Sequence, residues 1–277
     1  MATELGKRTA SAIVMAVVTL AAAWYGGTPF RVFSAAIALL IYYEWSKMTR
    51  LPEIDLRGDA FGWVAVTCVS ANLAFGDTGM GVPLLGGFVL TAVLLKFARR
   101  GSGWMPGGVF YAGLSGISLA AIRGGDQLGL MAILFVFAVV WGTDILAYFF
   151  GRSIGGPKLA PRISPGKTWS GAVGGTVSGV ALGSALVLAF FSNVPVQTIV
   201  LALLLSIFSQ IGDLFESFIK RRFGVKDSSH LIPGHGGVMD RVDGLVFACF
   251  AAFLLAMAYA AWTGYGESSV AGFLFGL

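Results

Sequence analysis

The sequence has few of the residues that build disulfide scaffolds, zinc sites or charged soluble surfaces. Its 277 residues include two cysteines, two histidines and only 12% Asp, Glu, Lys and Arg. Cys68 and Cys249 lie inside apolar runs without metal-ligand spacing, so we interpret both as small buried hydrophobic residues. The spacing of a Walker A loop is absent, as is any Ser-His-Asp or Cys-His arrangement. These absences argue against a disulfide scaffold, a zinc fold, a P-loop nucleotidase and a nucleophilic hydrolase.

What the sequence has in abundance is apolar residues and glycine. Hydrophobic residues make up 56% of the chain, which also holds 39 glycines and 22 phenylalanines. This composition is typical of polytopic membrane proteins, in which helices pack closely on small residues. We therefore predict an all-α membrane protein with about nine transmembrane helices, since each span needs about 20 mostly apolar residues. The nine apolar runs are 9–27, 30–48, 59–76, 82–98, 104–122, 129–151, 169–191, 196–220 and 243–264.

The distribution of basic residues predicts the orientation. With the N-terminus in the cytoplasm, all of the 19 Lys and Arg residues except Arg31 and Arg123 fall in cytoplasmic segments. The C-terminal tail carries neither Lys nor Arg, so the positive-inside rule predicts that it is external. The net charge of +5 then describes a cytoplasmic rim facing anionic lipid headgroups, and no basic surface with interleaved aromatic residues indicates nucleic acid. Aromatic clusters such as Tyr42-Tyr43-Glu44-Trp45 are interpreted as interfacial anchors.

The two halves of the chain differ in their polar content. Residues 1–128 have short connectors and are interpreted as packing helices with a role in dimerisation. Residues 129–277 carry two long cytoplasmic connectors, with acidic residues in the helices that flank them. We therefore expect the catalytic region in 129–277.

Four carboxylates of this second half stand where a membrane protein rarely places charge. Asp144 and Asp213 lie about two turns inside their spans, and Asp240 and Asp243 are three residues apart at the start of the last span. An ionisable group inside a span costs several kcal/mol unless it is paired or faces water. Intramembrane ion pairs such as Asp213 with Lys220 are the structural alternative. Oxygen ligands of this kind, with basic residues nearby, instead favour Mg²⁺ and a phosphoryl-transfer site.

The two glycine-rich connectors fit the same chemistry. Residues 151–171 supply glycines, basic side chains and a Ser-Pro-Gly-Lys-Thr segment, predicted to be a turn, just before a helix. Residues 233–237, Pro-Gly-His-Gly-Gly, precede the last span in the same way. Helix N-termini favour anions, and glycine lets the backbone approach a ligand closely.

Residues 217–243 read SFIKRRFGVKDSSHLIPGHGGVMDRVD, and this segment resembles the signature of a known family. The segment is similar, position by position, to the signature of the phosphatidate cytidylyltransferases, also called CDP-diacylglycerol synthases. The resemblance extends upstream to Asp144, Ala147-Tyr148, Gly151-Arg152 and Ser164 to Thr168, whereas the first half resembles the family only as a bundle of helices. One position departs from the pattern, because Ser170 stands where members often have Glu.

The resemblance implies transfer of the cytidylyl group of CTP to phosphatidic acid, giving CDP-diacylglycerol and pyrophosphate. It implies Mg²⁺, with room for a monovalent cation such as K⁺, membrane lipids as partners, a homodimer, and an active site facing the cytoplasm in a bacterial inner membrane. A membrane kinase acting on a lipid or polyprenol, and an ion-coupled transporter, are the alternatives.

The resemblance also assigns expected roles to individual residues. The expected metal ligands are Asp213 and Asp240, with Asp144 and Asp243 in support. The expected catalytic residues are Lys167, Lys220, Arg221, Lys226, Asp227, His235 and Arg241. The expected substrate-binding residues are Ser164, Lys167, Thr168, Ser217, Lys220, Gly236 and Gly237.

Overall fold

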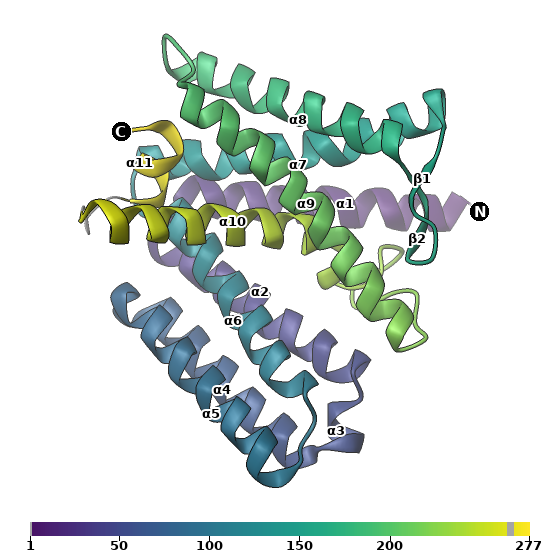
Figure 1. Ribbon diagram of the computed structural model, residues 1–277, viewed down its shortest axis with the longest axis vertical. Coiled ribbons are helices and arrows are strands. Elements are labelled where there is room, and N and C mark those ends of the chain that lie inside the picture. Colours follow the sequence, from purple (N-terminus) through teal and green to yellow (C-terminus); the bar gives the residue numbers. More distant parts are fainter. Residues whose placement is uncertain (1, 265–268) are drawn as a thin grey trace. The chain divides into compact units, whose positions relative to one another are not determined.

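The computed structural model describes residues 2–264 and 269–277, which are almost entirely helical (Figure 1). The helices before the central hairpin are α1 (Ala2–Tyr25), α2 (Gly27–Met48), α3 (Leu51–Ile54), α4 (Leu56–Phe75), the 3₁₀ helix η1 (Thr78–Met80), α5 (Gly81–Arg99), α6 (Trp104–Arg123) and α7 (Gln127–Ile154). The hairpin strands are β1 (Lys158–Ala160) and β2 (Ser164–Thr168). The helices after it are α8 (Trp169–Phe190), α9 (Val196–Arg222), α10 (Met239–Thr263) and α11 (Val270–Phe275).

A helix of at least 19 residues corresponds to each of the nine predicted apolar runs. Within the described residues, seven of these helices are long and apolar enough to cross a membrane. Of the other two, α2 contains three charged residues among its 22 residues and α4 contains two among its 20. The all-α membrane architecture is thus confirmed, whereas the count of nine spans and the orientation of the termini stay predictions.

The chain divides into two compact units. The first unit consists of Met1–Ala120 and Arg222–Arg241, and the second of Ala121–Arg221 and Val242–Leu277. In the first unit α2 packs against α1, α3 and α4, and α4 packs against α5. In the second unit α7 and α8 pack along each other, and α11 contacts α7. The connector after α9 therefore clusters with the N-terminal helices. The proposed division of function between 1–128 and 129–277 stays a prediction.

Glycine allows α7 and α8 to pack backbone against backbone. At Gly179, an added Cβ would stand 2.7 Å from the carbonyl oxygen of Val139 and 2.2 Å from Oγ1 of Thr143. No side chain larger than hydrogen fits at such distances, so the small-residue packing typical of membrane helices operates here. The same face of α8 carries buried glycines at every fourth position: Gly171, Gly175, Gly179 and Gly183.

A chain of hydroxyl and amide groups ties α9 to this helix pair. Thr143 Oγ1 on α7 lies 2.8 Å from Ser206 Oγ on α9, and Ser206 Oγ donates to Thr176 Oγ1 on α8 at 3.2 Å. Gln210 Nε2 donates to the same Thr176 oxygen at 2.8 Å. Hydrogen bonds between apolar helices satisfy polar groups that lipid cannot, so they set how α7, α8 and α9 are arranged.

The connector between α7 and α8 is a β-hairpin. β1 and β2 pair antiparallel, with Lys158 opposite Thr168 and Ala160 opposite Ser164. The prediction that Ser164 to Thr168 form a turn was therefore wrong, because both ends of the segment pair with β1 and the turn lies before it. β2 ends at Thr168 and α8 begins at the next residue, so the hairpin leads directly into the first turn of α8 (Figure 1).

The aromatic residues near the end of α2 are buried, which corrects their interpretation as interfacial anchors. Tyr42 is 0% exposed and Trp45 is 2% exposed. Trp45 Nε1 donates to the Trp104 carbonyl oxygen at 2.9 Å, so α2 is held against the start of α6. Trp24, by contrast, is 73% exposed, as expected for an interfacial residue.

Candidate active site

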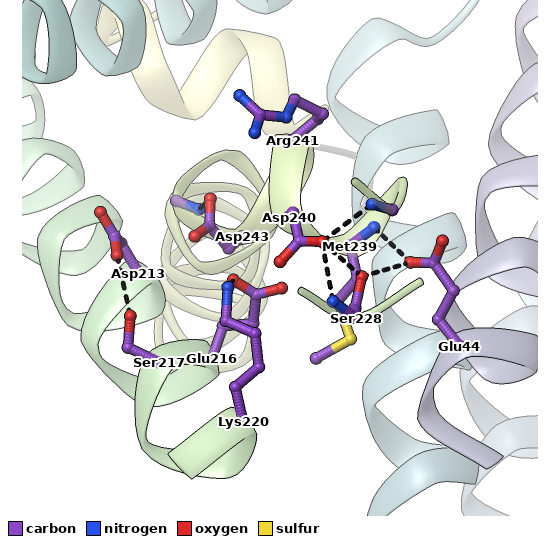
Figure 2. A network of polar contacts seen from close by, with 12 residues as sticks. Glu44, Asp213, Glu216, Ser217, Lys220, Ser228, Met239, Asp240, Arg241 and Asp243 are labelled. Atoms are coloured by element: carbon purple, nitrogen blue, oxygen red, sulfur yellow. Dashed lines mark hydrogen bonds and ion pairs between the residues drawn. The ribbon is translucent and has the colours of Figure 1, made fainter. Parts of the chain in front are cut away.

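An ion pair in the second unit joins the hairpin to α9. Lys167 Nζ lies 2.5 Å from Asp213 Oδ2, and the two side chains are 26% and 33% exposed. Ser217, one turn further along α9, donates to Asp213 Oδ1 at 3.4 Å (Figure 2). A partly exposed pair retains water and pays less desolvation than a sealed one, so each partner is accessible to a bound ion of the opposite charge.

Two further predicted carboxylates lie near this pair. Asp144 on α7 is exposed and close enough to Asp213, Asp243 and Lys167 to interact with them electrostatically. Asp243 on α10 interacts with Asp213 in the same way. The approach of α10 to α9 depends on Gly212, since an added Cβ there would stand 2.5 Å from the Asp243 carbonyl oxygen. Three helices thus bring Asp144, Asp213 and Asp243 together.

Glu216, three residues after Asp213 on α9, is a carboxylate with no role among those expected from the sequence. It is fully buried, and Lys220 Nζ lies 2.8 Å from its Oε2. It also contacts Asp243. Lys220, an expected phosphate ligand, is therefore held one helical turn from Glu216 beside the three carboxylates. The predicted alternative paired Asp213 with Lys220. The structure instead pairs Lys167 with Asp213 and Lys220 with Glu216.

Asp240 belongs to the first unit, where it organises the connector between α9 and α10, residues 223–238, here called the signature loop. Asp240 Oδ2 accepts hydrogen bonds of 2.8 Å from Ser228 N, from Ser228 Oγ and from Gly237 N (Figure 2). Three donors occupy the lone-pair directions of that oxygen. One oxygen of Asp240 therefore fixes the loop, and any metal contact of this residue falls to Oδ1.

The Pro-Gly-His-Gly-Gly segment of the signature loop is a tight turn. Ile232 N donates to the Gly236 carbonyl oxygen at 2.8 Å, and His235 N donates to the Ile232 carbonyl oxygen at 3.0 Å. Gly236 has a φ of +83°, which favours glycine. The Arg241 guanidinium donates from Nε to the His235 carbonyl oxygen at 3.0 Å, and His235 Nδ1 lies 2.8 Å from Ser11 Oγ on α1. His235 and Arg241 thus shape the turn, whatever ligand they also bind.

The remaining predicted cations and Asp227 project outward. All four side chains are exposed, as expected for groups that meet a ligand arriving from solvent: Arg221, Lys226, Asp227 and Arg241.

The hairpin residues have structural partners of their own. Ser164 pairs with Ala160 across the hairpin. Thr168 Oγ1 accepts from Gly171 N at 3.1 Å and so caps the N-terminus of α8. Ser170 Oγ donates to the Gly155 carbonyl oxygen and lies 3.1 Å from Thr168 Oγ1. Ser170 therefore ties the two ends of the α7–α8 connector together. Thr168 caps α8, and its role in substrate binding stays a prediction.

Comparison with known proteins identifies the family to which this architecture belongs. The chain matches the model of the cytidylyltransferase family over residues 6–259. The chain belongs to this cytidylyltransferase family. A protein of Brucella abortus (strain 9-941) named phosphatidate cytidylyltransferase is 48% identical over 265 residues, which cover 93% of this chain and 95% of that protein. Proteins of the same name from Bacillus subtilis and Staphylococcus haemolyticus are each 34% identical, covering 92% and 87% of this chain and 98% and 94% of theirs.

The cytidylyltransferase match runs through both units. Similarity over 93% of the chain includes the N-terminal helices. The expectation that the first half resembles the family only as a bundle of helices was therefore too narrow. Glu44 of α2 lies inside the matched region, and sequence reasoning missed it because it stood among aromatic residues taken for an interfacial cluster. The available signal was an acidic residue among apolar and aromatic neighbours, far from any predicted site.

The oxygen donors of this cytidylyltransferase suit the expected Mg²⁺, although those in the described residues do not form a complete site. Within residues 2–264 and 269–277, no three His, Cys, Asp or Glu side chains converge as a ready-made metal site. Mg²⁺ does not require one, because it commonly uses one or two carboxylates and completes its shell with water and phosphate oxygens. Asp144, Asp213 and Asp243 are oxygen donors of the right kind, and Asp144 is exposed. The donor set therefore fits a magnesium ion that shares its coordination with a nucleotide.

Proposed function

We propose that this cytidylyltransferase transfers the cytidylyl group of CTP to phosphatidate, producing CDP-diacylglycerol and pyrophosphate for phospholipid synthesis. The observation that carries the proposal is the Lys167–Asp213 pair, partly exposed and beside Asp144 and Asp243 on helices apolar enough to span a membrane. A lipid substrate reaches such helices from the bilayer. A nucleoside triphosphate needs cations that bind its phosphates and carboxylates that bind its metal ion.

The reaction needs little acid–base chemistry from the protein. A phosphate oxygen of phosphatidate attacks the α-phosphorus of CTP, the bond from that phosphorus to the oxygen bridging to the β-phosphorus breaks, and pyrophosphate leaves. The attacking phosphate monoester, with a second pKa of about 6, is largely ionised at neutral pH. Catalysis then consists of positioning and charge neutralisation.

The protein's cations supply that neutralisation. Lys167 exchanges part of its interaction with Asp213 for the incoming phosphates, and Lys220 stays fixed by Glu216 at 2.8 Å. Asp227 orients its basic neighbours, and His235 donates to a phosphate oxygen. The other phosphate-binding groups are Arg221, Lys226 and Arg241, with polar or backbone contacts from Ser164, Thr168, Ser217, Gly236 and Gly237.

A magnesium ion belongs to this proposal, with the three carboxylates of the second unit and Asp240 Oδ1 as its candidate ligands. When bound, it would neutralise the triphosphate and the charge that develops on the leaving group. A multi-pass location in the bacterial inner membrane, a cytoplasmic active site and a homodimer complete the proposal. The basic residues of the predicted cytoplasmic segments support the orientation.

The test uses the purified full-length protein with phosphatidic acid, Mg²⁺ and either CTP or ATP, and follows pyrophosphate and the labelled lipid. We expect pyrophosphate release with CTP only, together with a lipid product that contains cytidine. Release of a nucleoside diphosphate instead would indicate a lipid kinase. Pyrophosphate from ATP but not from CTP would overturn the assignment.

A further inference from the structure

Glu44 is a buried carboxylate that the proposed chemistry does not use. It lies on α2, four residues before the helix ends at Met48, and its side chain is 0% exposed. No Lys, Arg or His among the described residues forms an ion pair with it. A charge removed from water at such a position is costly unless several donors replace the solvent.

Four donors surround the Glu44 carboxylate, and all belong to the signature loop or to the residue that follows it. Oε1 accepts from Ser229 Oγ at 2.6 Å and from Val238 N at 2.8 Å. Oε2 accepts from Ser228 Oγ at 3.0 Å and from Met239 N at 2.6 Å (Figure 2). Each oxygen thus lies within hydrogen-bond distance of one hydroxyl and one backbone N–H group, and the single proton of the Ser228 hydroxyl is shared between Glu44 Oε2 and Asp240 Oδ2. The donors come from both ends of the loop, so a single side chain clamps its beginning to its end.

The position of the two N–H groups adds a helix-capping role. α10 begins at Met239, so the amides of Val238 and Met239 belong to the N-terminus of this helix. The N–H groups at a helix N-terminus have no acceptor within the helix itself. A carboxylate is the favoured partner there, both as an acceptor and as a charge opposite to the helix dipole. Glu44, 195 residues away in sequence, supplies this cap from another helix.

Glu44 is also linked to Asp240 through Ser228. The Ser228 hydroxyl lies 3.0 Å from Glu44 Oε2 and 2.8 Å from Asp240 Oδ2, between the two carboxylates (Figure 2). Gly237 is constrained by the same group, because an added Cβ would stand 2.0 Å from Ser228 Oγ and 2.5 Å from Glu44 Oε1. The second glycine of the His-Gly-Gly sequence is therefore required by the packing of the loop against Glu44.

We propose that Glu44 is a positioning residue that holds the signature loop in the conformation in which Lys226, Asp227 and His235 meet the nucleotide. The first two of these residues directly precede Ser228, and His235 lies three residues before Val238, so all three are fixed by the clamp. The loop-holding role stands on the contacts above, and its consequence for catalysis rests on the proposed function.

Glu44→Gln is the most direct test of the clamp. It keeps the size of the side chain but replaces one of the two acceptor oxygens with an NH₂ donor. Each oxygen faces a backbone N–H group that cannot reverse, so either orientation of the amide places its NH₂ group against a donor. Asp59→Asn is the matched control. Asp59 is a 6% exposed carboxylate of the same unit that accepts from Ser46 Oγ at 2.6 Å and does not belong to the loop network.

The experiment compares full-length wild type, E44Q and D59N in detergent by thermal unfolding, by hydrogen–deuterium exchange and by steady-state kinetics with CTP and phosphatidic acid. For folded E44Q we expect faster exchange in peptides covering 226–241, and a loss of about tenfold to a hundredfold in kcat/KM for CTP, since displacement of a binding group by about 1 Å has effects of this size. D59N should change neither quantity at temperatures where it is folded. Wild-type exchange and kinetics in E44Q would overturn the proposal.

Ser229→Ala replaces E44Q if that variant does not fold. It removes the 2.6 Å contact to Glu44 Oε1 without altering any charge. Faster exchange in 226–241 with a severalfold loss in kcat/KM supports the clamp, and no change in either measurement opposes it. If wild type itself releases no pyrophosphate from CTP, the proposed function fails, and the exchange measurement alone still decides whether Glu44 holds the loop.

Discussion

Lys167 Nζ, from the hairpin, lies 2.5 Å from Asp213 Oδ2 on α9. The contact joins residues that are separated by the whole of α8, and it connects the loop expected to bind phosphate with the helix expected to bind metal. Lys167 balances the charge of Asp213, and under the proposed function the same cation meets the phosphates of the nucleotide.

Lys167→Met should therefore impair turnover much more than it impairs folding. We expect kcat/KM for CTP to fall at least a hundredfold, or about 2.7 kcal/mol of transition-state stabilisation, because the cation is lost and Asp213, Asp144 and Asp243 repel one another without it. Lys158→Met is the matched control, since this exposed lysine lies on the other strand of the same hairpin. Equal losses for the two variants would show that Lys167 serves only the hairpin.

Asp213→Asn and Asp240→Asn test whether the two carboxylates serve one metal centre. Each should abolish nearly all turnover in a folded protein, and the double variant should lose little more than either alone, because residues that act as one unit are strongly non-additive. Asparagine can still accept the loop's hydrogen bonds at position 240, so hydrogen exchange in 226–241 should stay near that of wild type. An active, folded D240N protein with unchanged Mg²⁺ dependence would limit Asp240 to the loop.

Ser170→Ala should retain most activity, although family members often carry Glu at this position. The Ser170 hydroxyl donates to the Gly155 carbonyl oxygen, so its loss should cost about 1 kcal/mol of stability. Ser178→Ala is the control, because that hydroxyl only bonds to the Gly174 carbonyl oxygen of its own helix. A hundredfold loss of kcat in S170A would instead give Ser170 a direct part in the reaction.

Gly179→Ala should destabilise the second unit. The new methyl group would lie 2.2 Å from Thr143 Oγ1 and 2.7 Å from the Val139 carbonyl oxygen, so α7 and α8 must separate, at a cost of about 1–3 kcal/mol. Thermal unfolding in detergent should show a clearly lower midpoint than wild type. Gly86→Ala on α5, where an added Cβ has no neighbour within 4 Å, should leave the midpoint unchanged or raise it slightly.

The predicted orientation is tested with single cysteines in a background in which Cys68 and Cys249 are replaced. Lys226→Cys should react with an impermeant thiol reagent only from the cytoplasmic side, and Leu277→Cys only from the outside. Labelling of both positions from the same side would mean that the number of spans between them is even, and the count of nine would then be wrong.

The sequence by itself determined the helices and the membrane class, and it predicted the chemistry of the site. Spans are readable because twenty apolar residues in a row have one stable arrangement in lipid, and the predicted runs agree with the helices to within a few residues at most ends. Asp144, Asp213 and Asp243 were identified for the same reason, since charge in an apolar run is costly enough to signal a function.

Some local interpretations were wrong. The hairpin strand Ser164 to Thr168 looked like a turn, because its pairing partner could not be seen in its own residues. Cys68 is exposed rather than buried, whereas Cys249 is buried as predicted.

Only the tertiary structure decided which charges meet. That Asp213 pairs with Lys167 depends on the hairpin and on the packing of α9, and no spacing along one helix contains that information. Glu44 and Ser228 are the clearest case, because they are 184 residues apart and each is unremarkable in its own segment. Burial costs and local propensities can be read from neighbours in the chain. A hydrogen bond between distant segments exists only once the backbone has brought donor and acceptor within about 3 Å, and the fold alone sets that distance.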